Sequence, residues 1–203
     1  RAAIRKNKEA TESRRFSEIL ATVYDTFTRM VDDTDPRIPR VHYNLAETLF
    51  AIKDYSGATI HYRWVVNHPA LAEKDSTVAD SALKAIACRY EVLREKNLIP
   101  KELTARSPKA VKPASLDPLL GEWIEWIDVQ FAAYFKGDPK AGKDMAKTTE
   151  NFLFESARSL YAQGHIVKAM ERMRELIKRN PRSNYAVPSA SLILDTSIAS
   201  EDW

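Results

Sequence analysis

The chain has few of the residues that build disulfide-rich or β-rich proteins. It holds one cysteine, Cys88, and five glycines among 203 residues. A single thiol can form neither an internal disulfide nor a zinc site built on cysteines. Scarce glycine, together with the absence of Asn-Gly and Asp-Gly pairs, argues against a fold of strands and tight hairpins.

Long apolar runs and a strong excess of one charge are missing as well. No uninterrupted stretch approaches the roughly 20 apolar residues that span a bilayer, so we expect no transmembrane helix. The net charge is +3 with 29% charged residues, an ordinary balance for a soluble protein. The length suits one large domain or one extended array. Because the chain begins at Arg1 and shows no signal peptide, we expect an excised piece of a longer protein.

The most regular pattern lies between residues 151 and 181. Apolar residues recur at helical spacing over 153–161, and Gly164-His165 then breaks the pattern. A second apolar stripe follows over 166–177. Asn180-Pro181 ends that stripe, because a residue before proline disfavours the helical conformation. The segment therefore predicts a helical hairpin.

A second hairpin is predicted over residues 43–69, with its polar turn at Lys53-Asp54 and its end at Pro69. In both hairpins twelve residues separate a small side chain in the first helix from one in the second. The pairs are Ala46 with Ala58, and Ala157 with Ala169. Small side chains at these places let the paired helices approach closely, and the aromatic or Met residue four positions later fills the space beside them.

This pattern resembles the tetratricopeptide repeat (TPR), whose unit is a helix-turn-helix of about 34 residues closed by proline. The positions that match the family best are Ala157, Gly164, Ala169 and Pro181. In the earlier hairpin Lys53 replaces the family's glycine, Val65 replaces a usual alanine, and one residue is missing. The resemblance covers just over a quarter of the chain. It implies an all-α fold, an α-solenoid of TPR-like hairpins forming a single domain over 1–203. An unrelated helical bundle with two similar hairpins is the alternative.

Outside the hairpins the sequence predicts four further helices, over 14–31, 76–96, 119–136 and 185–200. The helix over 119–136 is apolar on two sides and is therefore expected to lie between neighbours. In the last helix Leu192 and Leu194 are expected to point inward, and we expect the array to continue beyond residue 203. Residues 97–118 carry four prolines and several Lys and Arg, and predict an extended, basic excursion that interrupts the array.

In the family, the first helices of the repeats line a concave groove that holds peptides or helices of partner proteins. The resemblance therefore implies a protein-protein interaction scaffold with an unidentified protein or peptide partner. The groove positions, carried over by register, are Arg40, Tyr43, Glu47, Phe50, Asn151, Phe154, Arg158 and Tyr161. Arg and aromatic side chains are the types enriched where binding energy concentrates. Packing against a neighbouring repeat is the other interpretation of these positions, above all for Phe50 and Tyr161.

Motifs for catalysis or cofactor binding are weak. Gly137–Asp144 resembles a phosphate-binding loop, G-x-x-x-x-G-K-[ST], but ends in Asp144 where a hydroxyl should bind Mg²⁺. We expect an inter-helix turn there, and keep a nucleotide-binding or enzymatic helical domain as an alternative. His42, His61, His68 and His165 form no metal-binding spacing, and we do not expect all four to lie on one surface. They are therefore expected to serve packing or solvent contacts rather than to bind a metal. Cys88 is expected to be an inert core thiol. We therefore predict no enzyme, no cofactor and no metal.

Basic stretches occur near both ends and in the excursion, at 1–15, 96–112 and 168–182. Glutamates interrupt each stretch, so solvated helix faces explain them better than nucleic acid does. A nucleic-acid-binding helical domain stays as a further alternative. The irregular hairpins and the long insertion resemble bacterial envelope-assembly and motility repeat proteins. That likeness slightly favours a periplasmic over a cytoplasmic location.

Overall fold

In the computed structural model, residues 2–71, 75–103, 111–135 and 143–200 are described, with the side chains of 2–10, 75–76, 131, 133–135 and 143–147 left aside. Every regular element within these ranges is a helix, which confirms the predicted all-α class. The chain divides into two compact units, residues 1–92 and 93–203. The expected single array over 1–203 stays a prediction.

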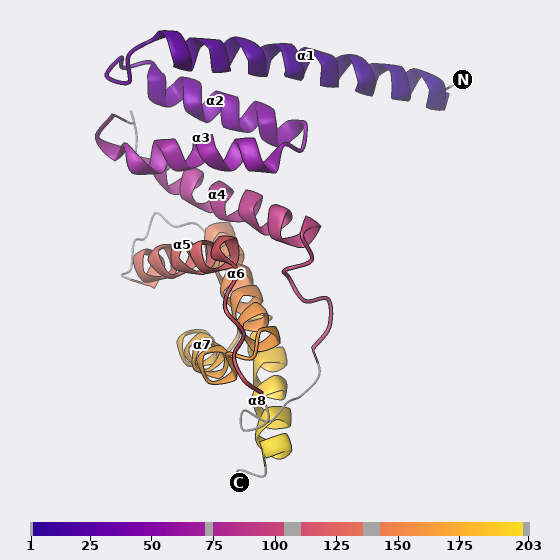
Figure 1. Cartoon of the computed structure of the whole chain (residues 1–203), viewed down its shortest axis with the longest axis vertical. Coiled ribbons are helices and arrows are strands. Elements are labelled where there is room, and N and C mark those ends of the chain that lie inside the picture. Colours follow the sequence, from indigo (N-terminus) through magenta and orange to yellow (C-terminus); the bar gives the residue numbers. More distant parts are fainter. Residues whose placement is uncertain (1, 72–74, 104–110, 136–142, 201–203) are drawn as a thin grey trace. The chain divides into compact units, whose positions relative to one another are not determined.

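The first unit contains four helices, and Figure 1 shows α2 lying between α1 and α3. Their bounds are α1 (Ala2–Met30), α2 (Ile38–Ala51), α3 (Tyr55–Asn67) and α4 (Asp75–Glu95). A short 3-10 turn at Pro69–Leu71 follows α3, and the last residues of α4 belong to the second unit. α4 packs on the α2–α3 pair through side chains. The shared core contains Ala46, Ala58, Tyr62, Ala85 and Cys88.

The second unit repeats this order of elements with α5 (Pro118–Phe135), α6 (Lys143–Ala162), α7 (Ile166–Arg179) and α8 (Ala186–Ser200). α6 is the central helix. It contacts α5 through the edge-to-face rings of Trp123 and Phe152, and α8 through the 2.8 Å bond between Tyr161 Oη and Thr196 Oγ1. In each unit a helical hairpin is thus preceded by one helix and followed by another.

Both predicted hairpins are present, as α2–α3 and α6–α7, and their small residues are buried as expected. The alanines that were predicted to sit at the helix contacts are almost completely inaccessible; these are Ala46, Ala58, Ala157 and Ala169. Tyr62 and Met173, four residues beyond the second alanine of each pair, are equally buried. The spacing therefore identified the contact positions of both hairpins correctly.

The two hairpin turns have the same backbone geometry. Residue 53 in one turn and residue 164 in the other adopt positive φ, 67° at Lys53 and 83° at Gly164. In each turn the next residue donates its backbone N–H to a carbonyl five positions back: Asp54 to Leu49, and His165 to Leu160, both at 2.9 Å. This is the Schellman ending of a helix, which favours glycine at the left-handed position. Lys53 adopts it despite carrying a side chain.

Two loops that flank the hairpins also match, the α1–α2 loop before the first hairpin and the α7–α8 loop after the second. In the α1–α2 loop, Asp32 and Asp35 cap the backbone N–H two residues ahead of each. In the α7–α8 loop, Asn180 and Ser183 do the same. The backbone bonds agree as well, from Asp35 to Asp32 and from Ser183 to Asn180. Different residue types thus build one loop geometry at two places.

The excursion at 97–118 is irregular in its described parts, as predicted, and it lies against the α6–α7 hairpin. Ala114 donates its N–H to the carbonyl of Gln163 at 2.9 Å. His165 Nε2 donates to the carbonyl of Ala114, also at 2.9 Å. A Cβ added at Gly164 would come within 2.9 Å of Val111. The excursion therefore belongs to the packing of the second unit.

Three predictions about the helices were wrong, one about where a helix begins and two about which side chains are buried. α1 begins far upstream of residue 14, because Ala, Lys, Arg and Glu favour helix without leaving an apolar stripe to detect. Val129 is exposed, so α5 is not covered on two sides along its length. Leu194 is exposed as well, whereas Thr196 of the same helix is buried through its bond to Tyr161.

Candidate functional site

The strongest cluster of polar side chains in the first unit joins α2 to α4 around Lys84. The Lys84 ammonium lies 2.6 Å from Glu47 Oε1 and 2.9 Å from Asp80 Oδ2. It also donates to the Tyr43 hydroxyl at 2.9 Å, and that hydroxyl donates to Asp80 at 2.7 Å. Glu47 accepts a further bond from the Tyr62 hydroxyl of α3. We call Tyr43, Glu47, Asp80 and Lys84 the Lys84 network.

The electrostatics of the network hold Lys84 in its charged form. Burial opposes that charge, but hydrogen bonds to Glu47, Tyr43 and Asp80 outweigh it and raise the pKa of Lys84. Burial, followed by the bond to Glu47, raises the pKa of Tyr62, which therefore keeps its proton. The Lys84, Glu47 and Asp80 side chains are each about a third to two-fifths exposed, so the network is open to solvent on one side.

Arg40 and Phe50, the other two predicted groove residues of α2, flank Tyr43 and Glu47 along the helix. Arg40 is exposed. Phe50 is 44% exposed and meets the ring of Tyr55 edge-on, with 5.6 Å between centroids. The four predicted residues of the first hairpin therefore form one row in which each side chain is at least partly exposed. Asp80 and Lys84 extend this surface onto α4, which the sequence did not indicate.

Arg158, a predicted groove residue of α6, is engaged within the protein. Its Nη1 atom lies 2.9 Å from both carboxylate oxygens of Glu155. Its Nη2 atom donates to the carbonyls of Pro100 and Lys101, at 3.2 and 3.0 Å. The guanidinium thus fastens the start of the excursion to α6.

The remaining predicted residues of the second hairpin differ in exposure. Tyr161 is completely buried, and a side chain so placed offers no surface to a partner. Phe154 is half-buried, lies 5.2 Å from the ring of Tyr185, and carries the Arg158 guanidinium 5.9 Å from its own ring centroid. Asn151 is half-buried. Most of this row is therefore occupied by the chain's own packing.

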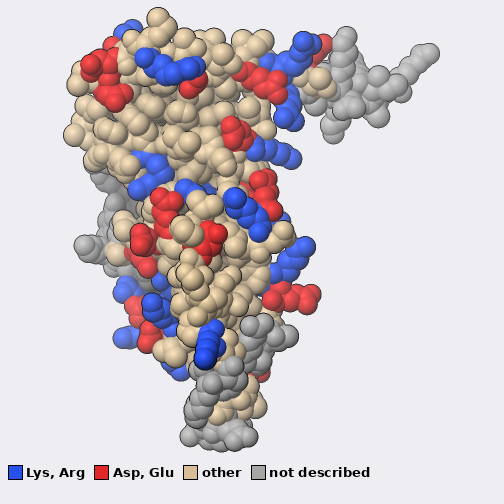
Figure 2. Space-filling model, viewed as in Figure 1, with Lys and Arg blue, Asp and Glu red and all other residues tan. Residues whose placement is uncertain are grey.

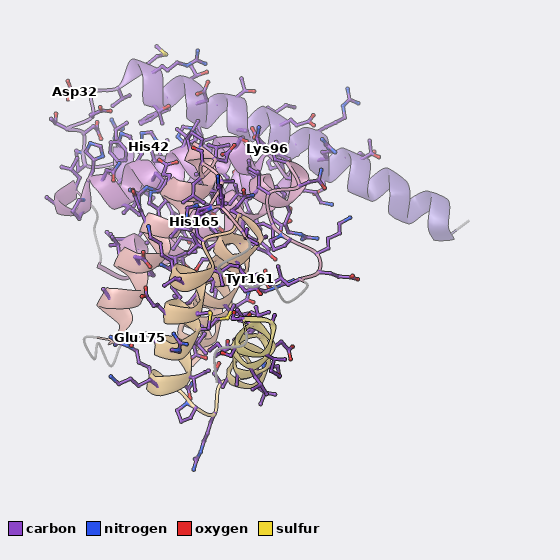
Figure 3. The ribbon with its side chains drawn as sticks, turned by 60° about the horizontal axis from the view of Figure 1, so that its bottom comes forward. Asp32, His42, Lys96, Tyr161, His165 and Glu175 are labelled. Carbon is purple, nitrogen blue, oxygen red and sulfur yellow. The ribbon has the colours of Figure 1, made fainter. Side chains whose placement is uncertain are left out.

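Three of the four histidines lie together in the first unit, where their rings pack against one another and against Trp64. His42 Nδ1 is 2.8 Å from His61 Nδ1, so one ring carries a proton there and the other accepts it. The ring of His42 stacks on Trp64 at 4.0 Å between centroids, and Trp64 stacks on His68 at 4.1 Å. We call these four residues the histidine stack. Figure 3 labels His42 of this stack and also His165, which comes from the other hairpin.

The histidine stack favours uncharged rings. Burial, followed by the neighbouring His61 and His68, lowers the pKa of His42 to about 4. Burial also lowers the pKa of His61, although Asp25 and Asp54 counteract it. His61, Trp64 and His68 follow one another at helical spacing along α3 and its C-terminal cap. This spacing is a signal from which the sequence could have predicted that the three rings lie on one side. The pairing with His42 across α2 and α3 is a tertiary contact that local patterns do not encode.

The other chemical candidates are inert or lie outside the described residues. Cys88 is buried in the core, as predicted, and burial raises the pKa of its thiol to about 12. The loop-like motif Gly137–Asp144 falls where backbone or side chains are not described. Within the described ranges, no group of three His, Cys, Asp or Glu side chains is placed to hold a metal ion. None of the described helices is long and apolar enough to cross a membrane.

No protein-family model matches the chain, and no curated protein is similar to it at a significant level.

Proposed function

We propose that the chain is a protein-protein interaction scaffold built from TPR-like hairpins, and that it holds a partner polypeptide along the face shared by α2 and α4. The observation that carries the proposal is the Lys84 network, which joins α2, the first helix of the α2–α3 hairpin, to α4 and stays partly open to solvent. Tyr43 in the network and the exposed Arg40 beside it on α2 are residue types enriched at interface hot spots.

The repeated geometry supports a solenoid rather than an unrelated bundle. Two hairpin turns share one helix ending, and two connecting loops share one set of caps. Repeats of this kind stack because each buries its apolar face only on its neighbour. Arg158 holds the excursion on α6, so we assign the partner surface to the first hairpin, at Arg40, Tyr43, Glu47 and Phe50.

Affinity capture with paired variants tests this proposal. Arg40→Ala and Phe50→Ala remove exposed side chains of the proposed surface, and each should weaken partner binding about tenfold, the loss expected at an interface hot spot. Lys168→Ala, an exposed position on α7, is the control and should capture the same proteins as the wild type. Equal capture by all four proteins, with equal helicity, would remove the assignment.

Two alternatives predict different measurements. A nucleotide-binding domain using Gly137–Asp144 requires the melting temperature to rise in Mg-ATP, since a ligand that binds only the folded state stabilises it. We expect no rise. A nucleic-acid-binding domain requires binding that weakens steeply with salt. On the face shown in Figure 2, acidic and basic side chains are interspersed over α2 to α4. We therefore expect no such binding there.

A further inference from the structure

α1 has two different apolar faces. One packs against α2 and includes the buried Ala21 and the half-buried Tyr24 and Phe27. The other faces solvent, and its large side chains are Phe16, Ile19, Val23 and Met30, which are 67%, 64%, 57% and 80% exposed. We call these four residues the α1 seam. Figure 1 shows α1 on the outer side of α2 and extending past its end.

The spacing of the α1 seam is that of a coiled coil. Phe16, Ile19, Val23 and Met30 follow one another at three, four and seven residues, the a and d positions of a heptad, with Thr26 at the intervening d position. All five side chains are exposed. A continuous row of exposed apolar residues on a protein surface marks an interaction site. The heptad spacing indicates that the occupant is another helix.

The charges along α1 indicate which helix that is. Residues 1–15 contain six basic and two acidic side chains, whereas residues 16–37, up to the start of α2, contain five acidic and two basic ones. Figure 2 shows the acidic side chains gathered where α1 turns into α2, at the left of the view. A second α1 running antiparallel sets the basic start of each helix beside the acidic second half of the other and the acidic loop that follows it. A parallel pair would oppose like charges.

We propose that the α1 seam is a self-association surface, and that two copies of this chain pair their α1 helices antiparallel about a two-fold axis. Such an interface is isologous, because each copy contributes the same residues. It uses residues of α1 alone, none of which belongs to the α2–α4 surface, and does not depend on the function proposed above. The paired seams bury Phe16, Ile19, Val23 and Met30 of both copies.

Sedimentation velocity of the whole chain tests the proposal, from low to high micromolar concentration. The wild type should be dimeric at the upper end of the range. Ile19→Glu places a charge in the seam and should raise the dimer dissociation constant at least about tenfold. Ile60→Glu is the matched control, because Ile60 lies on α3 of the same unit and is 67% exposed. This variant should dimerise like the wild type.

Further measurements separate the outcomes. Circular dichroism should show unchanged helicity in each variant, and Val23→Glu repeats the test at a second seam position in case Ile19→Glu does not fold. Asp33→Lys reverses a charge at the acidic end and should weaken an antiparallel dimer, most strongly at low salt. A wild type that stays monomeric throughout the range overturns the proposal. So does a dimer that Ile60→Glu disrupts and the seam variants do not. A dimer strengthened by Asp33→Lys overturns the antiparallel arrangement.

Discussion

Lys53 and Gly164 occupy the same left-handed position in the two hairpin turns, with opposite energetic consequences. A side chain at positive φ brings Cβ close to a neighbouring carbonyl oxygen, which costs about 1–2 kcal/mol. Lys53 bears this cost in an exposed turn. We expect Lys53→Gly to raise the free energy of unfolding by about 0.5–1 kcal/mol, after the greater freedom of glycine in the unfolded chain is counted. Urea unfolding measures the change.

Gly164→Ala is the reciprocal substitution and should destabilise. The backbone there has a φ of 83°, which is strained for a residue with a side chain. The added Cβ would also lie 2.9 Å from Val111 Cγ1 and 3.0 Å from the Lys112 carbonyl oxygen. Strain and crowding together should lower the free energy of unfolding by at least about 1–2 kcal/mol. If both substitutions changed stability in the same direction, the two turns would not share the geometry described.

The histidine stack makes the first unit sensitive to acid. In the unfolded chain a histidine has a pKa of about 6.5, whereas His42 in the folded protein has a pKa of about 4. Between these values the unfolded state binds a proton that the folded state does not, so stability falls as pH falls from about 6.5 to about 4. The groups that face this pair are His68 for His42, and Asp25 and Asp54 for His61. Neither carboxylate acts on His42 directly.

His42→Phe keeps a ring against Trp64 and removes the titrating group. The variant should lose less stability than the wild type between pH 7 and pH 4.5, measured by urea unfolding at both values. Val167→Phe, at an exposed position of α7 in the other unit, serves as the comparison and should follow the wild type. An equal acid loss in all three proteins would show that His42 does not couple folding to protons.

Among the elements, the excursion depends on Arg158 for its attachment to α6. The carbonyls of Pro100 and Lys101 both accept from this guanidinium. Arg158→Ala removes both donors, and a hydrogen bond from a charged group contributes about 1.5–3 kcal/mol. Local opening at Lys101 should then become easier, and trypsin should cleave after Lys101 about tenfold faster. Mass spectrometry of the fragments locates the cut.

Arg174→Ala controls for that experiment, since Arg174 is an exposed residue of α7. Its variant should be cleaved after Lys101 at the wild-type rate. Cleavage after Lys101 that does not respond to Arg158→Ala would mean that the excursion is held by the Ala114 contacts alone.

For the whole molecule, sequence patterns predicted what repeats locally and missed what is joined over distance. Ala46 with Ala58, and Ala157 with Ala169, identified both hairpins because helix spacing and close packing are properties of neighbouring turns. The bond from Arg158 to Lys101 spans 57 residues, and the His42–His61 bond spans 19. Neither leaves a periodic trace. The groove positions on α2 could be predicted from their register in the repeat. The extension of this surface to Lys84 could not, because it depends on how α4 packs against α2.

The exposed side chains of α1 show a further limit of prediction from sequence patterns. By spacing alone, one side of this amphipathic helix holds Phe16, Ile19, Leu20, Val23, Phe27 and Met30. The structure divides them between a face on α2 and the seam, because a stripe wider than one contact leaves part of itself uncovered. Periodicity indicates which side of a helix is apolar, and only packing shows how much of that side is used.

The fastening of Ala114 to the second hairpin bears on any attempt to shorten this protein. Excising 97–117 to make the array regular would remove the hydrogen-bond partners of the Gln163 backbone carbonyl, the His165 imidazole and Arg158 Nη2. It would also remove the Val111 side chain that lies against Gly164. The excursion therefore packs on the α6–α7 hairpin as part of the second unit. A shortened protein would need other residues to make these contacts.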